Sequence, residues 1–169
     1  MSRGKHFALI HFRFEVVEGI IAAKETLKKV SLWGTILGVS SVYKRYMTKE
    51  ATDLSAYLEF VIRIETTLNV EETLANLMSY CASGGMGIVQ SPFAELTLLV
   101  FDDLVQMSPK LTLPYPRLHE DPLIIRSASE AWGQYEHPIY QRNLSDLSRL
   151  APPVGEIEFY IQGKTLVDF

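Results

Sequence analysis

The run His6–Phe14 limits the fold of this chain more than any other segment. It reads His-Phe-Ala-Leu-Ile-His-Phe-Arg-Phe, which is rich in β-forming residues and nearly continuous in apolar side chains. A strand with one face in water alternates apolar and polar residues, whereas a strand covered on both faces does not. The run therefore predicts a central strand of a sheet that other elements cover.

The segments that follow alternate between helical apolar spacing and β-rich runs. We expect, in chain order, a helix over Val16–Val30, a strand over Thr35–Tyr46, a strand over Tyr57–Thr66, a helix over Val70–Cys81 and a strand over Phe93–Phe101. Asn69 is predicted to cap the second helix, with Glu71 and Glu72 in its first turn. Together with the first strand, the order is βαββαβ, which predicts an α+β fold with a ferredoxin-like core.

Within the strand expected at Tyr57–Thr66, apolar and polar side chains alternate. The even-numbered residues from 58 to 64 are apolar, and Glu59, Arg63 and Glu65 fall on the opposite face. This pattern predicts a strand with a polar or solvent-facing side.

Prolines divide the final third of the chain into loops. We expect short helices near Ser127–Trp132 and Ser145–Leu150, followed by a closing β-type segment, Glu156–Ile161. No linker divides the sequence, so we predict one domain over residues 1–169, with a core at about 6–150 and a β-type tail at 154–169.

Composition excludes several classes of protein. Hydrophobic residues make up 47% of the chain and charged residues 21%, which is typical of a globular domain. A net charge of −4 gives nothing that attracts nucleic acid or an anionic membrane, and we expect neither partner. Cys81 is the one cysteine, so no internal disulfide can form. Because no signal peptide is recognisable either, we predict a cytoplasmic location.

The sequence contains no convincing catalytic constellation. Gly84, Gly85 and Gly87 stand between a helix and a strand, which is the reverse of the order in a phosphate-binding loop. Glu95 and Thr97 are two positions apart on a strand and so face the same side, but one carboxylate and one hydroxyl make a poor magnesium site. We predict a polar strand face there.

Two further groups are predicted to be unremarkable surface. The run His119-Glu120-Asp121 favours a solvated turn over a metal site, because adjacent loop residues seldom converge on one ion. The pair Lys44-Arg45 is predicted to be solvated as well. His6 and His11 are an odd number of positions apart on one strand, so they face opposite ways.

Several segments resemble a known enzyme family. They are Ser40–Lys44 (Ser-Ser-Val-Tyr-Lys), Ala56–Thr66 (Ala-Tyr-Leu-Glu-Phe-Val-Ile-Arg-Ile-Glu-Thr), Phe93–Phe101 and Leu111–Pro114 (Leu-Thr-Leu-Pro). In this order they are similar to 6-hydroxymethyl-7,8-dihydropterin pyrophosphokinase (HPPK), an enzyme of folate biosynthesis. The resemblance covers most of residues 7–150 and implies a ferredoxin-like fold, in agreement with the order of elements above.

The positions that the family uses for catalysis differ here. The resemblance places Glu95-Leu-Thr97 where HPPK has the Asp-Leu-Asp that binds two magnesium ions, and Glu59 where an asparagine contacts the pterin. Tyr115 stands in place of a histidine, and Asp121-Pro-Leu123 in place of Arg-Gly-Phe. The resemblance therefore implies a remnant metal site at Glu95 and Thr97. It also implies a ligand cleft with five residues: Tyr57, Glu59, Tyr115, Asp121 and Leu123.

Two more segments depart from the family. His11-Phe-Arg13 stands where HPPK has Gly-Ser-Asn. The loop at 85–92 lacks the arginines and the tryptophan with which the family covers ATP. One arginine of this kind can contribute about 10³–10⁵ in phosphoryl-transfer rate, so losing several such groups removes most of the catalysis.

The sequence therefore favours a pseudoenzyme: a binding, regulatory or protein-interaction module that pairs with another protein or with itself. An apolar patch at Met86, Ile88, Val89 and Phe93 would mark that surface. One alternative is an active pyrophosphokinase that uses Mg²⁺ and ATP with relocated ligands. A second alternative is a binder of a pterin-like small molecule, in which Glu59 accepts from the guanidine-like edge of the ligand.

Overall fold

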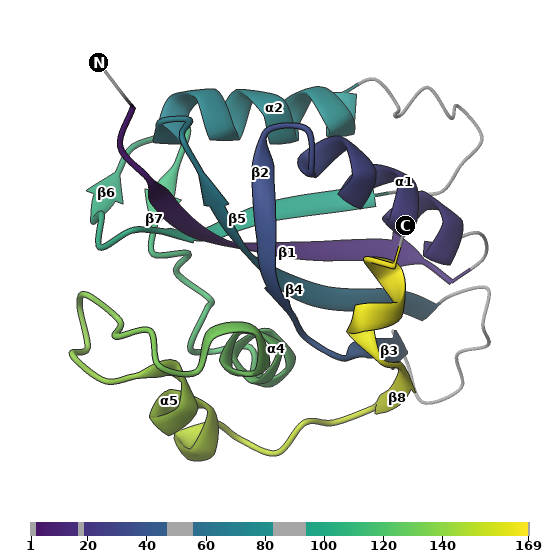
Figure 1. Cartoon of the computed structure of the whole chain (residues 1–169). Helices are drawn as coiled ribbons and strands as arrows, with labels where there is room; N and C mark the ends of the chain where they lie inside the picture. The colour runs from purple at the N-terminus through teal and green to yellow at the C-terminus, as the bar shows by residue number, and fades with distance from the viewer. Residues whose placement is uncertain (1–2, 17–18, 47–55, 83–93, 169) are drawn as a thin grey trace.

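An antiparallel sheet with helices on both faces makes up the fold in the computed structural model, which describes residues 3–16, 19–46, 56–82 and 94–168 (Figure 1). The elements are β1 (His6–Glu15), α1 (Gly19–Val30), β2 (Gly34–Val39), β3 (Val42–Tyr46), β4 (Ala56–Thr66), α2 (Val70–Ala82), β5 (Ala94–Phe101), β6 (Gln106–Met107), β7 (Thr112–Leu113), α4 (Pro122–Trp132), α5 (Leu144–Leu150), β8 (Ile157–Ile161) and the 3-10 helix η2 (Gly163–Leu166). The predicted α+β class with a βαββαβ core is confirmed.

The central position predicted for the first strand is confirmed as well. Among the described residues, the main sheet has the order β5-β1-β4-β3-β8, and β2 also pairs with β4. β1 pairs antiparallel with both β4 and β5. Its successive side chains enter two different cores: Ile10 packs with α1 and α2 on one face, and Leu9 packs with α4 on the other. Figure 1 shows α1 and α2 on one side of the sheet, with α4 and α5 on the other.

The strand expected at Thr35–Tyr46 is divided into β2 and β3. Both pair with β4, at successive positions along it. Between them, the Ser40 side chain takes part in the pairing: the Val61 N–H donates to Ser40 Oγ at 2.9 Å. A side-chain oxygen thus replaces a backbone acceptor at this point, which interrupts the ladder.

The predicted polar side of β4 is only partly in solvent: Arg63 and Glu65 are half-buried there. Glu59 and Val61 are both buried. The reason is α4, which packs over this face and begins at Pro122 instead of near Ser127. The Arg63 guanidinium lies 4.2 Å from the centre of the Trp132 ring, so that cation also packs against α4.

Helix caps account for several of the observed boundaries. Asn69 Oδ1 accepts from the Glu72 N–H at 2.8 Å and the Glu72 carboxylate accepts from the Asn69 N–H at 3.0 Å, so the predicted cap is confirmed as a reciprocal capping box. Asp121 caps α4, with Pro122 in its first turn. The solvated turn predicted at this aspartate is wrong, because Asp121 is buried.

The C-terminal segment closes the sheet. α5 begins after Asn143, whose side chain accepts from the Asp146 N–H. β8 then pairs antiparallel with β3, in agreement with the predicted β-type tail, and η2 returns to the face that holds α1. Across the described residues, no helix combines the length and the apolar character needed to cross a membrane.

Candidate functional site

A polar cavity of about 220 Å³ opens on the α4 side of the sheet. Its lining residues come from β1, β3, β4, β5 and the segment that leads into α4. They are His11, Arg13, Arg45, Glu59, Glu95, Thr97, Tyr115, Arg117, Asp121 and Ile124. We call this hollow the polar cavity.

Strand register brings the β-sheet part of this lining together. Arg13 on β1 stands opposite Glu59 on β4 and opposite Glu95 on β5. Two residues earlier on β1, His11 stands opposite Thr97 on β5. Side chains at alternate positions of a strand share a face, so these five residues form two adjacent rows on one side of the sheet.

Glu59 is the most deeply buried charged group of the site, with 2% of its surface exposed. Its Oε1 atom lies 2.9 Å from Nε2 of His11, and its Oε2 atom lies 2.6 Å from Nε of Arg45. The Nε–H of Arg45 does not point at Oε2, so this second contact is an ion pair without a hydrogen bond. Burial alone would raise the pKa of Glu59, but the His11 hydrogen bond and the charges of His11 and Arg45 lower it overall.

Arg45 links Glu59 to the start of α4. Its Nη2 atom donates to both Asp121 carboxylate oxygens, at 2.8 and 3.0 Å, and lies 3.3 Å from Glu59 Oε1. Burial opposes the charge on Arg45, but the Asp121 hydrogen bond and the two carboxylate charges outweigh it and raise the pKa of Arg45. The expectation that Lys44-Arg45 is solvated surface is wrong, because Lys44 is buried and Arg45 is paired inside the fold.

Asp121 has two roles at once. Besides holding Arg45, its Oδ1 atom accepts from the backbone N–H groups of Leu123 and Ile124, at 3.0 and 3.2 Å. Burial would raise the pKa of Asp121, but the Arg45 hydrogen bond and charge, together with these two N–H groups, lower it. A carboxylate with this many donors is well stabilised in its charged form.

Arg13 lines the cavity near the start of β4, and Tyr57 lies behind it. The Arg13 guanidinium lies 4.0 Å from the centre of the Tyr57 ring, and its Nη1 atom lies 3.8 Å from Glu95 Oε2. A cation over an aromatic face is held by the ring's quadrupole. Tyr57 therefore acts on the cavity through Arg13 and does not line it.

The structure brings most of the sequence-predicted site residues together. Glu59, Glu95, Thr97, Tyr115 and Asp121 all line the polar cavity. Tyr57 lies behind Arg13, and the Leu123 side chain is buried, with its backbone N–H on Asp121.

The sequence prediction missed the cationic part of the lining, Arg45 and Arg117, and did not assign a role to His11 or Arg13. His11 and Arg13 occupy alternate positions of β1, the strand that lies between Glu59 on β4 and Glu95 on β5. This shared face is the signal that could have identified them. Arg45 had no such signal, because its partner Asp121 is 76 positions away.

Other candidate groups lie apart from this cavity. His6 pairs with Asp102, with its Nδ1 atom 2.6 Å from Oδ2, so the two histidines of β1 serve different places, as predicted. His119 and Glu120 line a separate hollow, so the run His119–Asp121 is divided between two hollows. The glycine loop at 84–87 and the apolar patch expected at Met86, Ile88, Val89 and Phe93 lie outside the described residues.

Acids and bases are balanced within the polar cavity. Three carboxylates, from Glu59, Glu95 and Asp121, line it together with three arginines, at 13, 45 and 117. Among the described residues, no three His, Cys, Asp or Glu side chains are grouped closely enough to hold a metal ion. The arrangement offers hydrogen-bond donors and acceptors to a small polar molecule.

Comparison with solved structures identifies the class of fold. The wild-type HPPK-DHPS of Plasmodium falciparum with pterin and p-hydroxybenzoate matches with a TM-score of 0.68 and 8% sequence identity, over 89% of this chain and 42% of that chain. A variant of the same protein with pteroate gives a TM-score of 0.67 and 8% identity, over 88% and 41% of the two chains. The same variant with SDX-DHP gives a TM-score of 0.66 and 10% identity, over 88% and 46% of the two chains.

These matches show an α+β protein with an HPPK-like fold. At 8–10% identity they establish the fold alone. The chain spans less than half the length of the HPPK-DHPS chains that it matches. No family model matches the sequence, and none of the curated proteins does.

Proposed function

We propose that this chain is a non-catalytic, HPPK-like binding domain whose polar cavity takes a small planar molecule with a pterin-like edge. The observation that carries the proposal is the pairing of the cavity's carboxylates with arginines of the same chain: Arg45 holds Glu59 and Asp121, and Arg13 lies beside Glu95. In an ATP-dependent enzyme, such carboxylates bind metal ions and such arginines bind phosphates. Here the carboxylates and arginines of the cavity pair with each other.

The charge around Glu95 argues against diphosphate transfer. Such a reaction depends on divalent cations that bridge the phosphates. Here the Glu95 carboxylate has the Arg13 guanidinium 3.8 Å away. The next side chain on the same face of the strand is Thr97. Like charges about 4 Å apart repel by about 4 kcal/mol per pair of unit charges at a protein surface, so a magnesium ion would have to displace Arg13 first.

The size and polarity of the cavity favour one small ring system. About 220 Å³ is below the roughly 300–1,000 Å³ of pockets for drug-sized ligands. Glu59 is a buried acceptor whose Oε2 atom makes no hydrogen bond, which suits the donor pair of a guanidine-like edge. HPPK-DHPS structures, which match this fold over less than half of their chains, contain pterin or pteroate, and we infer a related edge for the ligand of this chain.

Calorimetric titration with 6-hydroxymethylpterin and, separately, with a Mg-ATP analogue tests the proposal. We expect weak, saturable binding of the pterin, because it competes with Arg45 for Glu59, and no binding of the nucleotide. The Glu59→Gln variant should lose pterin binding by about tenfold. Glu25→Gln is the matched control, since it makes the same change at an exposed position on α1.

Two outcomes would replace the proposal. Binding of both ligands, with diphosphate transfer to the pterin alcohol, would establish an active pyrophosphokinase. Binding of neither would remove the small-molecule role and leave a protein partner as the reason for the fold.

A second candidate function, self-association, is favoured by β8. This strand pairs with β3 on one side and with no strand on the other among the described residues, and it exposes Phe159 and Tyr160. An open edge with exposed aromatics can pair with a second copy of itself. Sedimentation velocity over a hundredfold concentration range tests this, with Phe159→Lys expected to keep the protein monomeric.

A further inference from the structure

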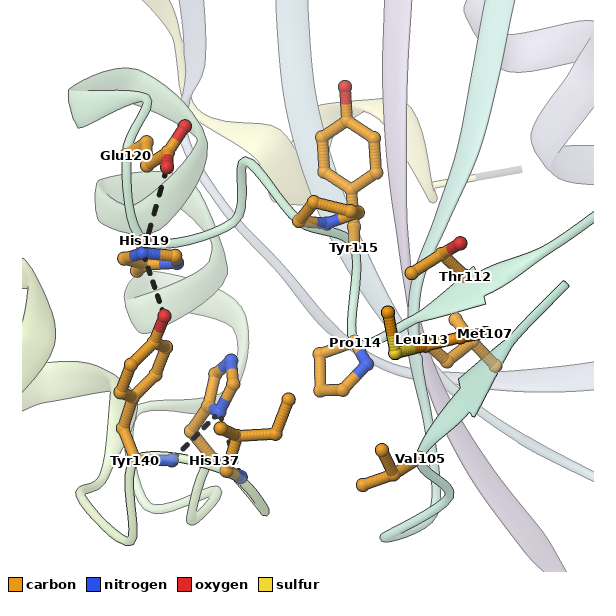
Figure 2. Close-up of a pocket in the computed structure, with 12 residues that line it drawn as sticks. Val105, Met107, Thr112, Leu113, Pro114, Tyr115, His119, Glu120, His137 and Tyr140 are labelled. Carbon is orange, nitrogen blue, oxygen red and sulfur yellow. Dashed lines mark hydrogen bonds and ion pairs between the residues drawn. The ribbon is translucent and has the colours of Figure 1, made fainter. Parts of the chain in front are cut away.

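A second hollow, separate in chemistry from the polar cavity, lies between the β6–β7 hairpin and the loop at 137–141 (Figure 2). Its volume is about 270 Å³. We call it the apolar cavity. Figure 2 shows Val105, Leu113 and Pro114 on one side, and His119, His137 and Tyr140 facing them from the other.

The rim of the apolar cavity exposes large apolar side chains. Val105, Met107, Ile139 and Tyr140 are each between 45% and 85% exposed, although all four line the same hollow. Isolated exposed apolar residues need no explanation, but a group of them around one depression marks a surface that binds an apolar molecule.

The aromatic side contains a histidine whose Nε2 donor points away from its own loop. His137 is only 2% exposed, and its Nδ1 atom accepts from the backbone N–H groups of Ile139 and Tyr140, at 3.2 and 3.4 Å. The proton of the neutral ring is therefore on Nε2. In the part of the chain that the structure describes, no hydrogen bond is made by that atom, and Figure 2 shows it directed toward the space below His119.

The neighbouring rings supply a stacking surface. The Tyr140 ring centre lies 4.6 Å from the ring centres of both His119 and His137. The Tyr140 hydroxyl and Nε2 of His119 are 3.0 Å apart, which fixes the two rings relative to each other. A planar ring that enters between this group and Pro114 would have an aromatic face on one side and an aliphatic face on the other.

The charges of the residues that line the apolar cavity decide which planar ligands fit it. His137 is neutral near pH 7, because burial and the nearby His119 lower its pKa to about 4. Glu120 is the acidic group of this lining, and its carboxylate lies 4.0 Å from Nε2 of His119. A ligand carboxylate would meet this negative charge and no fixed positive one, so a neutral acceptor fits better.

We propose that the apolar cavity binds a small, neutral aromatic carbonyl compound. The ring lies between Pro114 and Tyr140, and the carbonyl oxygen accepts from the Nε2–H of His137. The site is independent of the function proposed for the polar cavity, since the two hollows share only Tyr115.

Titration of ¹⁵N-labelled protein with benzamide tests the proposal by NMR. We expect saturable shifts of the His137 ring nitrogens and of the Ile139 and Tyr140 amides, with a Kd on the order of 1 mM for a fragment of this size. Benzoate, the charged analogue, should bind at least tenfold more weakly.

Two variants separate binding from folding. His137→Asn keeps an acceptor for the Ile139 and Tyr140 amides and removes the Nε2–H, so the spectrum should stay folded while benzamide affinity falls about tenfold. Met107→Ser changes an exposed rim residue and should weaken binding about threefold without touching His137. Should His137→Asn fail to fold, the Met107 variant and the benzoate comparison still decide the matter.

Three results would overturn the proposal. The first is a failure of the ligand test: either the His137 ring nitrogens show no saturable NMR shifts, or benzoate binds as tightly as benzamide. The second is a shift of the His11 ring in place of the His137 ring, which would put benzamide in the polar cavity. The third is a set of shifts at Val105, Met107 and Ile139 that depends on protein concentration alone, which would make this surface a contact between copies.

Discussion

Arg45 and Asp121 lie 76 positions apart in the sequence, yet Nη2 of the arginine is 2.8 and 3.0 Å from the two oxygens of the aspartate. The pair joins β3 to the N-cap of α4, and both residues line the polar cavity. The carboxylate also caps the helix, so one side chain sets both the helix start and the position of the arginine.

Removing the Asp121 carboxylate should therefore destabilise the fold in two separable steps. Asp121→Asn keeps a capping oxygen but loses the ion pair, and we expect a loss of about 2 kcal/mol in the free energy of unfolding. Asp121→Ala loses the cap too and should cost about 3 kcal/mol. Urea denaturation measures both, and Asp168→Asn, at an exposed position, is the control. Equal stability of all three variants would contradict the double role.

Stability should fall with acid because of Glu59 and Asp121. Both groups have a pKa below the ordinary values of 4.5 and 3.8, so the folded state holds fewer protons than the unfolded state in this range. Their contribution is complete above the unfolded pKa values and is lost as pH falls through the lower, folded ones. The free energy of unfolding, measured from pH 7 to pH 2.5, should drop more steeply below pH 4.5 in the native protein than in a Glu59→Gln/Asp121→Asn variant. Parallel curves would show that neither carboxylate is stabilised by folding.

Strand patterns accounted for the sheet and for half of the candidate site. Period-two spacing put Glu95 and Thr97 on one face, and the resemblance added Glu59 and Asp121; all four line one cavity. What the sequence did not show is which face α4 would cover. The Asp-Pro signal for the start of that helix is present at Asp121, but the run His119-Glu120-Asp121 also favours a solvated turn, and a solvated turn leaves the polar side of β4 without a covering helix.

Long-range ion pairs explain the remaining omission. Nothing near Arg45 in sequence distinguishes it from an exposed basic residue such as Lys28, because its partners are on β4 and at the start of α4. Only the tertiary arrangement makes it part of the site. Local pattern can place a side chain on a face of a strand, but it cannot say what lies opposite that face.

His137 should give a second pH dependence, at higher pH than the carboxylates. Its pKa is lowered from 6.5 to about 4, because burial and His119 disfavour its charged form. The unfolded state therefore takes up a proton first as the pH falls, so stability is complete above pH 6.5 and declines as the pH drops toward 4. The native protein should lose stability over this interval relative to His137→Asn. NMR titration of the His137 ring should show no protonation above pH 5, and a midpoint near 6.5 would refute the assignment.

Gly163 gives a test of packing with a matched control in the same chain. A Cβ atom at this position would overlap the backbone oxygen of Ser40, and backbone cannot move aside as a flexible side chain can. Gly163→Ala should therefore push η2 away from the break between β2 and β3, at a cost of about 2–3 kcal/mol in the free energy of unfolding. At Gly155 an added Cβ meets nothing within 4 Å, so Gly155→Ala should be neutral or slightly stabilising. Thermal and urea unfolding of the two variants measure the difference. If Gly163→Ala were as stable as Gly155→Ala, η2 would not be packed against Ser40 in solution.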